Sequence, residues 1–307
     1  MALLSTTNHP PPTNHGVTFS PMYAKYLGLD FQKTYLSILD DLKVRHLRIP
    51  SYWSKIEKNQ GKYDFSEVDF MVSEAEKRGA KIILVVGIKQ PRWPECHIPD
   101  WAKELSVEKR QEKALEYIET TVKRYLDSTS IIAWQVENEP FVSWFGESCD
   151  ALDANFLQKE VEMVKKLDPD RPIIITDSGE WSLWVTASKY ADTLGISVYR
   201  KAHNSKLGLV TYPLPSWYYT LKSKLISKKT IISELQAEPW SEKGIAETAI
   251  EDQIKLFSPQ DFKANQEYAS KIGFGEVYFW GVEWWYYMAA NGHPEYLRVA
   301  KTVFDPI

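Results

Sequence analysis

Short apolar segments alternate with amphipathic segments along the chain, and this alternation limits the possible folds more than any other feature of the sequence. Eight apolar segments have the length of buried strands, and they lie at 16–20, 44–49, 82–86, 131–140, 172–176, 194–199, 230–233 and 276–280. Helices are predicted between them, for example at 31–42, 109–126 and 181–190. Eight strand–helix units in 307 residues predict an α/β protein, a single-domain (β/α)8 TIM barrel over residues 16–307.

Residues 1–15 are rich in Pro, Thr and Asn and are expected to form an extended N-terminal arm. They lack the basic start and long apolar run of an intact signal peptide, so the compartment stays open between secreted and cytoplasmic. A doubly wound open sheet is the alternative fold. It usually carries a glycine-rich turn after its first strand, and none is seen here.

Charge and composition narrow the classes of partner. The 37 Lys and Arg against 41 Asp and Glu give a net charge of −4, which offers no electrostatic reason to expect nucleic acid or an anionic membrane. No apolar run is long enough to span a bilayer. We expect a monomer or a weak oligomer. We expect no cofactor and no metal, since no phosphate loop, metal triad or Ser/His/Asp arrangement is found.

The two cysteines, Cys96 and Cys149, both follow predicted strands. They form neither a CxxC motif nor a zinc-binding spacing. Because both are expected in loops after strands, either a disulfide between them or two free thiols fits the sequence.

The segment 131–140, IIAWQVENEP, begins as a buried strand and ends in polar residues. Pro140 cannot donate a hydrogen bond to a strand ladder, so the strand must end there. Asn138 and Glu139 therefore lie at the carboxyl end of a strand, where α/β folds place their active sites. The simpler interpretation is that Glu139 is an ordinary surface carboxylate.

Tryptophans gather in the segments that follow the predicted strands, which share one rim of a barrel. Ten of the chain's twelve tryptophans fall there: Trp53, Trp93, Trp144, Trp181, Trp184, Trp217, Trp240, Trp280, Trp284 and Trp285. A sugar ring has an apolar face that stacks on aromatic rings and hydroxyls that need polar partners. The group predicts a carbohydrate cleft, although any single tryptophan could instead be packing.

Two carboxylates stand out on this rim, Glu139 after the fourth strand and Glu234 at the end of the seventh. Strands four and seven face each other across a barrel of eight, so both carboxylates are predicted at its mouth. Glycosidic cleavage needs such a pair, one as acid and the other as nucleophile or base. A separation of about 5–5.5 Å would give retention of configuration. Glu238 and Glu283 are rival nucleophiles.

Together these motifs resemble clan A glycoside hydrolases, a TIM-barrel superfamily with its acid/base and nucleophile on strands four and seven. Asn138-Glu139-Pro140 resembles the acid/base motif of the clan, and IISELQ places Glu234 at the nucleophile position. Residues 48–72 resemble both family 5 cellulase-like and family 42 β-galactosidase-like enzymes.

The resemblance implies roles for further residues of this sequence. Asn138 would bind the sugar 2-hydroxyl, Arg48 would hold the nucleophile, and Tyr199 would donate a hydrogen bond to it. Trp280 would form the floor under the sugar, and His97 would stand for a strand-three histidine. The remaining predicted substrate-binding residues are the rim tryptophans Trp53, Trp93, Trp181 and Trp284.

These observations predict a retaining glycoside hydrolase that cleaves a β-linked oligo- or polysaccharide in an endo-glycanase-like cleft. An exo-acting β-glycosidase is the alternative within the same chemistry. A non-catalytic carbohydrate-binding barrel is the alternative of another class.

Overall fold

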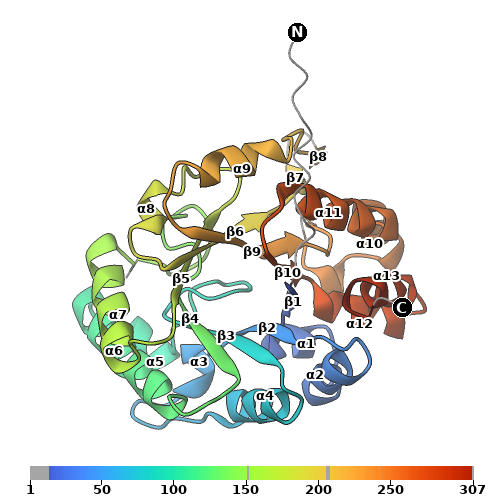
Figure 1. Ribbon diagram of the computed structural model, residues 1–307. Helices are drawn as coiled ribbons and strands as arrows, with labels where there is room; N and C mark the ends of the chain where they lie inside the picture. The colour runs from blue at the N-terminus through green and yellow to red at the C-terminus, as the bar shows by residue number, and fades with distance from the viewer. Residues whose placement is uncertain (1–13, 151, 205–207, 242, 306–307) are drawn as a thin grey trace.

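The structure, a computed structural model, describes residues 14–150, 152–204, 208–241 and 243–305. Eight parallel strands form a closed barrel in the order β1-β10-β9-β6-β5-β4-β3-β2 (Figure 1), which confirms the predicted (β/α)8 fold. The barrel strands are β1 (Asn14–Thr18), β2 (His46–Pro50), β3 (Lys81–Val86), β4 (Ile131–Val136), β5 (Ile173–Ser178), β6 (Thr193–Val198), β9 (Lys229–Gln236) and β10 (Glu276–Trp280). The predicted arm at 1–15 lies outside the described residues, except that Asn14 and His15 open β1.

Helices surround the barrel strands as the alternation predicts (Figure 1). They are α1 (Pro21–Tyr26), α2 (Phe31–Asp40), α3 (Trp53–Ile56), α4 (Ser66–Lys77), α5 (Asp100–Lys103), α6 (Val107–Arg124), α7 (Ala154–Leu167), α8 (Val185–Ser188), α9 (Trp217–Ser223), α10 (Ile250–Leu256), α11 (Pro259–Ile272), α12 (Val282–Ala290) and α13 (Glu295–Phe304), with the 3-10 turn η1 (Ile245–Glu247) before α10. The helix predicted at 181–190 is wrong over most of its length. Trp184 has φ 68°, a left-handed conformation that interrupts a right-handed helix, so only α8 is helical there.

The barrel interior is packed with side chains. Ile83, Ala133, Ile174, Ile231 and Tyr278, one from each of five barrel strands, form a small buried cluster separate from the large core between strands and helices. Successive strand residues point to opposite faces, so their neighbours along each strand pack outward. This alternation of side-chain direction along each strand therefore determines which polar residues at the strand ends point into the barrel.

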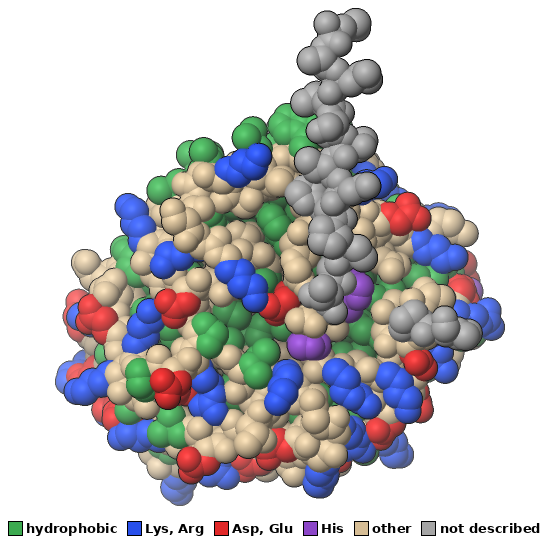
Figure 2. Space-filling view, in the orientation of Figure 1, with side chains coloured by type: hydrophobic (Ala, Val, Ile, Leu, Met, Phe, Trp, Pro, Cys, Tyr) green, Lys and Arg blue, Asp and Glu red, His purple; other side chains and the backbone are tan. Residues whose placement is uncertain are grey.

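A short antiparallel hairpin, β7 (Lys201–Asn204) with β8 (Gly208–Thr211), extends from the end of β6 and was not predicted from the sequence. Gln236 at the end of β9 holds its base, because its side-chain oxygen accepts hydrogen bonds from the amides of Arg200 and Lys201 at 3.0 and 2.9 Å. None of the described helices is long and apolar enough to cross a membrane. Acidic and basic side chains are interspersed on the face seen in Figure 2.

Candidate active site

Arg48 lies at the centre of the polar groups at the barrel mouth. It is in register with inward-facing Ile83, and its side chain is fully buried. Its guanidinium donates to Glu234 Oε1 at 2.8 Å, to Asn138 Oδ1 at 2.6 Å and to Gln135 Oε1 at 2.7 Å. A planar guanidinium holds several acceptors in fixed directions, so this one residue orients the ends of β4 and β9 toward each other.

Glu234 receives hydrogen bonds at both carboxylate oxygens. Arg48 occupies Oε1, and the Tyr199 hydroxyl donates to Oε2 at 3.0 Å. Burial and the neighbouring Glu234 carboxylate raise the pKa of Tyr199 well above its usual value, so the phenol keeps the proton that it donates. A carboxylate fixed by an arginine and a phenol has the orientation and charge support that a nucleophile needs.

Glu139 has a different environment. It follows β4 at φ 45°, a left-handed conformation that is costly for a residue other than glycine and typical of functional sites. Its amide donates to Thr176 Oγ1 at 2.8 Å, and its Oε1 accepts from the Ser197 hydroxyl at 2.7 Å. Burial and the Glu234 carboxylate raise the pKa of Glu139 to about 8, so this carboxyl group holds a proton at neutral pH.

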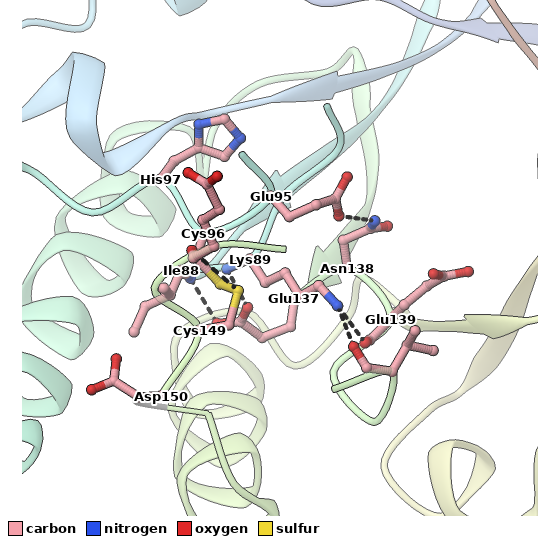
Figure 3. The surroundings of a disulfide bond; sticks show 12 residues. Ile88, Lys89, Glu95, Cys96, His97, Glu137, Asn138, Glu139, Cys149 and Asp150 are labelled. Atoms are coloured by element: carbon pink, nitrogen blue, oxygen red, sulfur yellow. Dashed lines mark hydrogen bonds between the residues drawn. A yellow bond between two sulfur atoms is a disulfide. The ribbon is translucent and has the colours of Figure 1, made fainter. Parts of the chain in front are cut away.

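Glu95 is a third carboxylate of the site that the sequence analysis did not identify. It accepts a hydrogen bond from Asn138 Nδ2 at 3.0 Å (Figure 3). Its exposed fraction is 4%. Burial raises the pKa of Glu95 to about 7, with a further contribution from Glu234. It lies nine residues beyond the end of β3, so no strand-end position marks it in the sequence.

A disulfide joins Cys96 and Cys149, which decides between the two alternatives left by the sequence. The bond links the segment after β3 to the segment after β4, directly beside Glu95 (Figure 3). The Glu147 amide also donates to the Pro94 carbonyl at 3.0 Å. The disulfide therefore fixes the loop that carries Glu95 against Asn138.

Three of the predicted aromatic residues lie at a strand end or in loops, and two lie in the core. Trp280 ends β10 opposite Gln236 of β9 and is 8% exposed, whereas Trp93 and Trp181 lie in loops at 55% and 66% exposure. The prediction for Trp53 and Trp284 is wrong. Both are fully buried on helices, and their indoles donate to Glu57 and Gln253 respectively. They pack the core and cannot contact a ligand.

The predicted substrate contact of His97 is also wrong. The ring is 2% exposed and packs against Tyr52, with their centroids 4.0 Å apart. One ring nitrogen lies 3.0 Å from the Arg92 carbonyl oxygen, and burial lowers the pKa of His97 to about 3. His97 is a neutral side chain that holds the loop after β3 in shape.

Ser197 and Gln135 are further site residues that the sequence analysis missed. Ser197 lies on β6 two residues before Tyr199, the first residue after that strand, so strand alternation directs both side chains the same way. Gln135 has the same relation to inward-facing Ala133 on β4. The period of two was thus the signal that could have identified them.

A closed (β/α)8 barrel with several buried carboxyl groups at its mouth fits the O-glycosyl hydrolases of clan A. The family model described as cellulase (glycosyl hydrolase family 5) matches residues 12–229, and the chain belongs to this family. The matched region ends before Glu234, so the family match does not include this residue. Its place in the site is known from its own contacts with Arg48 and Tyr199.

Three similar proteins illustrate the range of the likeness. Mannan endo-1,4-β-mannosidase A from Emericella nidulans is 26% identical over 135 residues, which are 40% of this chain and 33% of that protein. The exo-β-1,4-mannosidase Op5Man5 from Opitutaceae bacterium strain TAV5 has a TM-score of 0.60 at 11% identity, covering 99% of this chain and 62% of the other. A β-galactosidase from the psychrophilic Marinomonas ef1 has a TM-score of 0.59 at 12% identity, covering 87% and 53%. The two structural likenesses concern the fold, and the chain spans about a third of the curated relative.

Proposed function

We propose that the protein is a retaining glycosidase that hydrolyses β-linked mannosides, with Glu139 as the acid/base and Glu234 as the nucleophile. The observation that carries this proposal is the contrast between the two carboxyl groups. Glu139 holds a proton because its pKa is raised to about 8, while Glu234 receives hydrogen bonds from Arg48 and Tyr199. A carboxyl group that holds a proton, facing a second one that is held by an arginine and a phenol, is the arrangement that double displacement at a sugar requires.

In the first step, a Glu234 oxygen attacks the anomeric carbon, and Glu139 gives its proton to the leaving oxygen. The bond between the anomeric carbon and the leaving oxygen breaks as the glycosyl–enzyme bond forms. In the second step, Glu139 takes a proton from water, and the water oxygen displaces Glu234. Each carboxyl group thus returns to its starting protonation state.

Asn138 is positioned to recognise the sugar beside the bond that breaks. Its Oδ1 accepts from Arg48, and one hydrogen of Nδ2 is donated to Glu95. The second Nδ2 hydrogen is the donor that remains for the 2-hydroxyl. Because both ends of the amide are fixed, this hydrogen bond needs little reorganisation when substrate binds.

The sugar is assigned from the relatives. The mannan endo-1,4-β-mannosidase of Emericella nidulans matches part of the barrel, and the exo-β-1,4-mannosidase of the Opitutaceae bacterium has the same fold. Both names specify β-1,4-linked mannose. We therefore place β-1,4-mannosides first among the substrates, ahead of glucosides, xylosides and galactosides.

The proposal is tested with p-nitrophenyl β-glycosides of these four sugars and with β-1,4-manno-oligosaccharides. The β-mannosides should be the best substrates, and proton NMR should show β-mannose as the first product. Glu234→Gln should lower kcat by at least about 10³-fold. Glu139→Gln should lower it by about 10²–10⁴-fold for substrates with poor leaving groups and much less for dinitrophenyl glycosides, which need no acid.

Three results would count against the proposal. An α-configured first product would mean inversion. Full activity of Glu234→Gln would remove the assigned nucleophile. Binding of manno-oligosaccharides without turnover of any substrate would favour the non-catalytic carbohydrate-binding barrel.

A further inference from the structure

The segment between β3 and α5, residues 87–99 (the β3 loop), reaches across the barrel mouth. Its Arg92 forms ion pairs with Glu238, after β9, and with Glu283, after β10, the latter at 2.7 Å. In the ring of strands, β3 and β9 are separated by β2, β1 and β10 on one side and by β4, β5 and β6 on the other. A contact between the β3 loop and the end of β9 therefore spans the opening, and Figure 1 shows a loop of the β3 colour within the ring.

This crossing, which we call the Arg92 bridge (Arg92, Glu238 and Glu283), is a built and buried structure. The three side chains are 4%, 6% and 0% exposed. The guanidinium lies between two aromatic rings, 3.7 Å from the centroid of Tyr23 and 4.1 Å from that of Trp280. Removing one member of a buried ion pair leaves an uncompensated charge, so the bridge is costly to open.

The loops on both sides hold the bridge in place. The Ser20 amide donates to Glu283 Oε1 at 2.6 Å, which ties the bridge to the end of β1. The Tyr52 hydroxyl donates to the Pro91 carbonyl at 2.7 Å, and the disulfide fixes the other end of the β3 loop. The bridge is thus attached to the segments that follow β1, β2 and β4.

The chemistry defines which part of the substrate meets this bridge. In the proposed mechanism, the attacked sugar lies beside Glu234 and the leaving group lies beside Glu139. The contacts of Glu139 with Thr176 of β5 and Ser197 of β6 place that side toward β4, β5 and β6. A further sugar at the non-reducing end would extend away from Glu139. The Arg92 bridge occupies that direction, because it covers the β2-β1-β10 sector and contacts Trp280 itself.

We propose that the Arg92 bridge closes the site beyond a single sugar, so that the enzyme releases monosaccharides one at a time from non-reducing ends. This inference rests on the proposed function and deepens it. It favours the exo-acting alternative over the endo-acting cleft that was expected from the sequence and that the name of the curated relative suggests. Oε2 of Glu238 is buried, Trp280 lies within reach of its carboxyl group, and no donor among the described residues makes a well-formed hydrogen bond to Oε2. We assign it as the acceptor for a hydroxyl of the terminal sugar, reached when the side chains that cover it move aside. An internal sugar carries that hydroxyl's oxygen in the glycosidic linkage.

The test uses β-1,4-mannohexaose labelled with a fluorophore at its reducing end, and the same hexaose methylated at the non-reducing 4-hydroxyl. The unblocked substrate should give mannose and a ladder of labelled products, each shorter by one residue, with the pentaose first. The blocked substrate should be cleaved at least about 100-fold more slowly. Release of labelled fragments from the blocked hexaose at a similar rate would overturn the inference and leave the glycosidase proposal intact. If neither the hexaoses nor the aryl β-glycosides are cleaved, the proposed function itself fails.

A matched pair of variants tests the role of Glu238. Glu238→Gln and Glu283→Gln each remove one negative charge from Arg92, but both oxygens of Glu283 already bind protein donors. Loss of a charged acceptor for a sugar hydroxyl should lower kcat/KM of Glu238→Gln about 10–100-fold below that of Glu283→Gln. The unfolding temperatures of both variants are measured in parallel. Equal kcat/KM values for two folded variants would remove Glu238 from sugar recognition.

Discussion

The hydrogen bond from Ser197 to Glu139 sets the pH at which this proposed acid catalyst loses its proton. The Ser197 hydroxyl is held by a 3.4 Å hydrogen bond from the Gly179 amide and donates to Glu139 Oε1 at 2.7 Å. A donor to a carboxylate favours its charged form, so this bond lowers the pKa of Glu139 against the upward effects of burial and Glu234. Removing the hydroxyl should raise that pKa further.

The size of the effect follows from the burial of the pair. A hydrogen bond to a charged group is worth about 1.5–3 kcal/mol, and Glu139 is only half-buried, so water replaces part of what is lost. We take about 1.4 kcal/mol, which corresponds to about one pH unit. Since the proposed mechanism needs protonated Glu139, the alkaline limb of kcat/KM in Ser197→Ala should move upward from about pH 8 by about one unit.

Ser233→Ala is the matched control, because Ser233 lies on the neighbouring strand β9 at 1% exposure and its hydroxyl has no hydrogen-bond partner among the described residues. The pH dependence of kcat/KM of Ser233→Ala should be the same as that of the unchanged enzyme. The assay is kcat/KM for an aryl β-mannoside between pH 5 and 10. A limb that stays in place or moves downward in Ser197→Ala, or that moves equally in Ser233→Ala, would refute this reasoning.

Two further predictions concern stability. Arg48→Met leaves the buried Glu234 carboxylate without its cation and should lower the free energy of unfolding by about 3–5 kcal/mol in urea titrations, whereas unchanged stability would mean that the pair contributes nothing net. The double change Cys96→Ser and Cys149→Ser removes a cross-link across 53 residues and should lower it by about 4 kcal/mol, measured against the oxidised parent. Equal unfolding of the double variant and the parent would show that the loops are held by their other contacts alone.

The strand order and the strand-end residues could be predicted because they follow from local patterns. Each strand can be identified without knowledge of the others. Its apolar residues recur with a period of two, it can end at a proline, and the helical spacing of apolar residues resumes after it. This placed Arg48, Asn138 and Glu234 correctly at the barrel mouth, where the structure brings them together. Local patterns were sufficient there because each residue lies within or just after its own strand.

The loops could not be predicted in the same way. Arg92 and Glu238 are 146 residues apart in sequence, and nothing near either residue specifies the other. The same limit explains the tryptophans. Trp284 was placed on the rim because it follows β10, but α12 begins two residues before it and turns its indole into the core. Distance along the chain from a strand end does not determine whether a side chain faces solvent.

Because β10 pairs with β1, the barrel can close only late in the synthesis of the chain on the ribosome. β10 pairs with β1 along five residues, and Glu283 binds the Ser20 amide across 263 positions of sequence. A nascent chain can therefore contain both Glu139 and Glu234 and still lack Trp280 and Glu283. We expect the proposed hydrolysis to begin only when the last barrel strand has emerged from the exit tunnel and inserted beside the first.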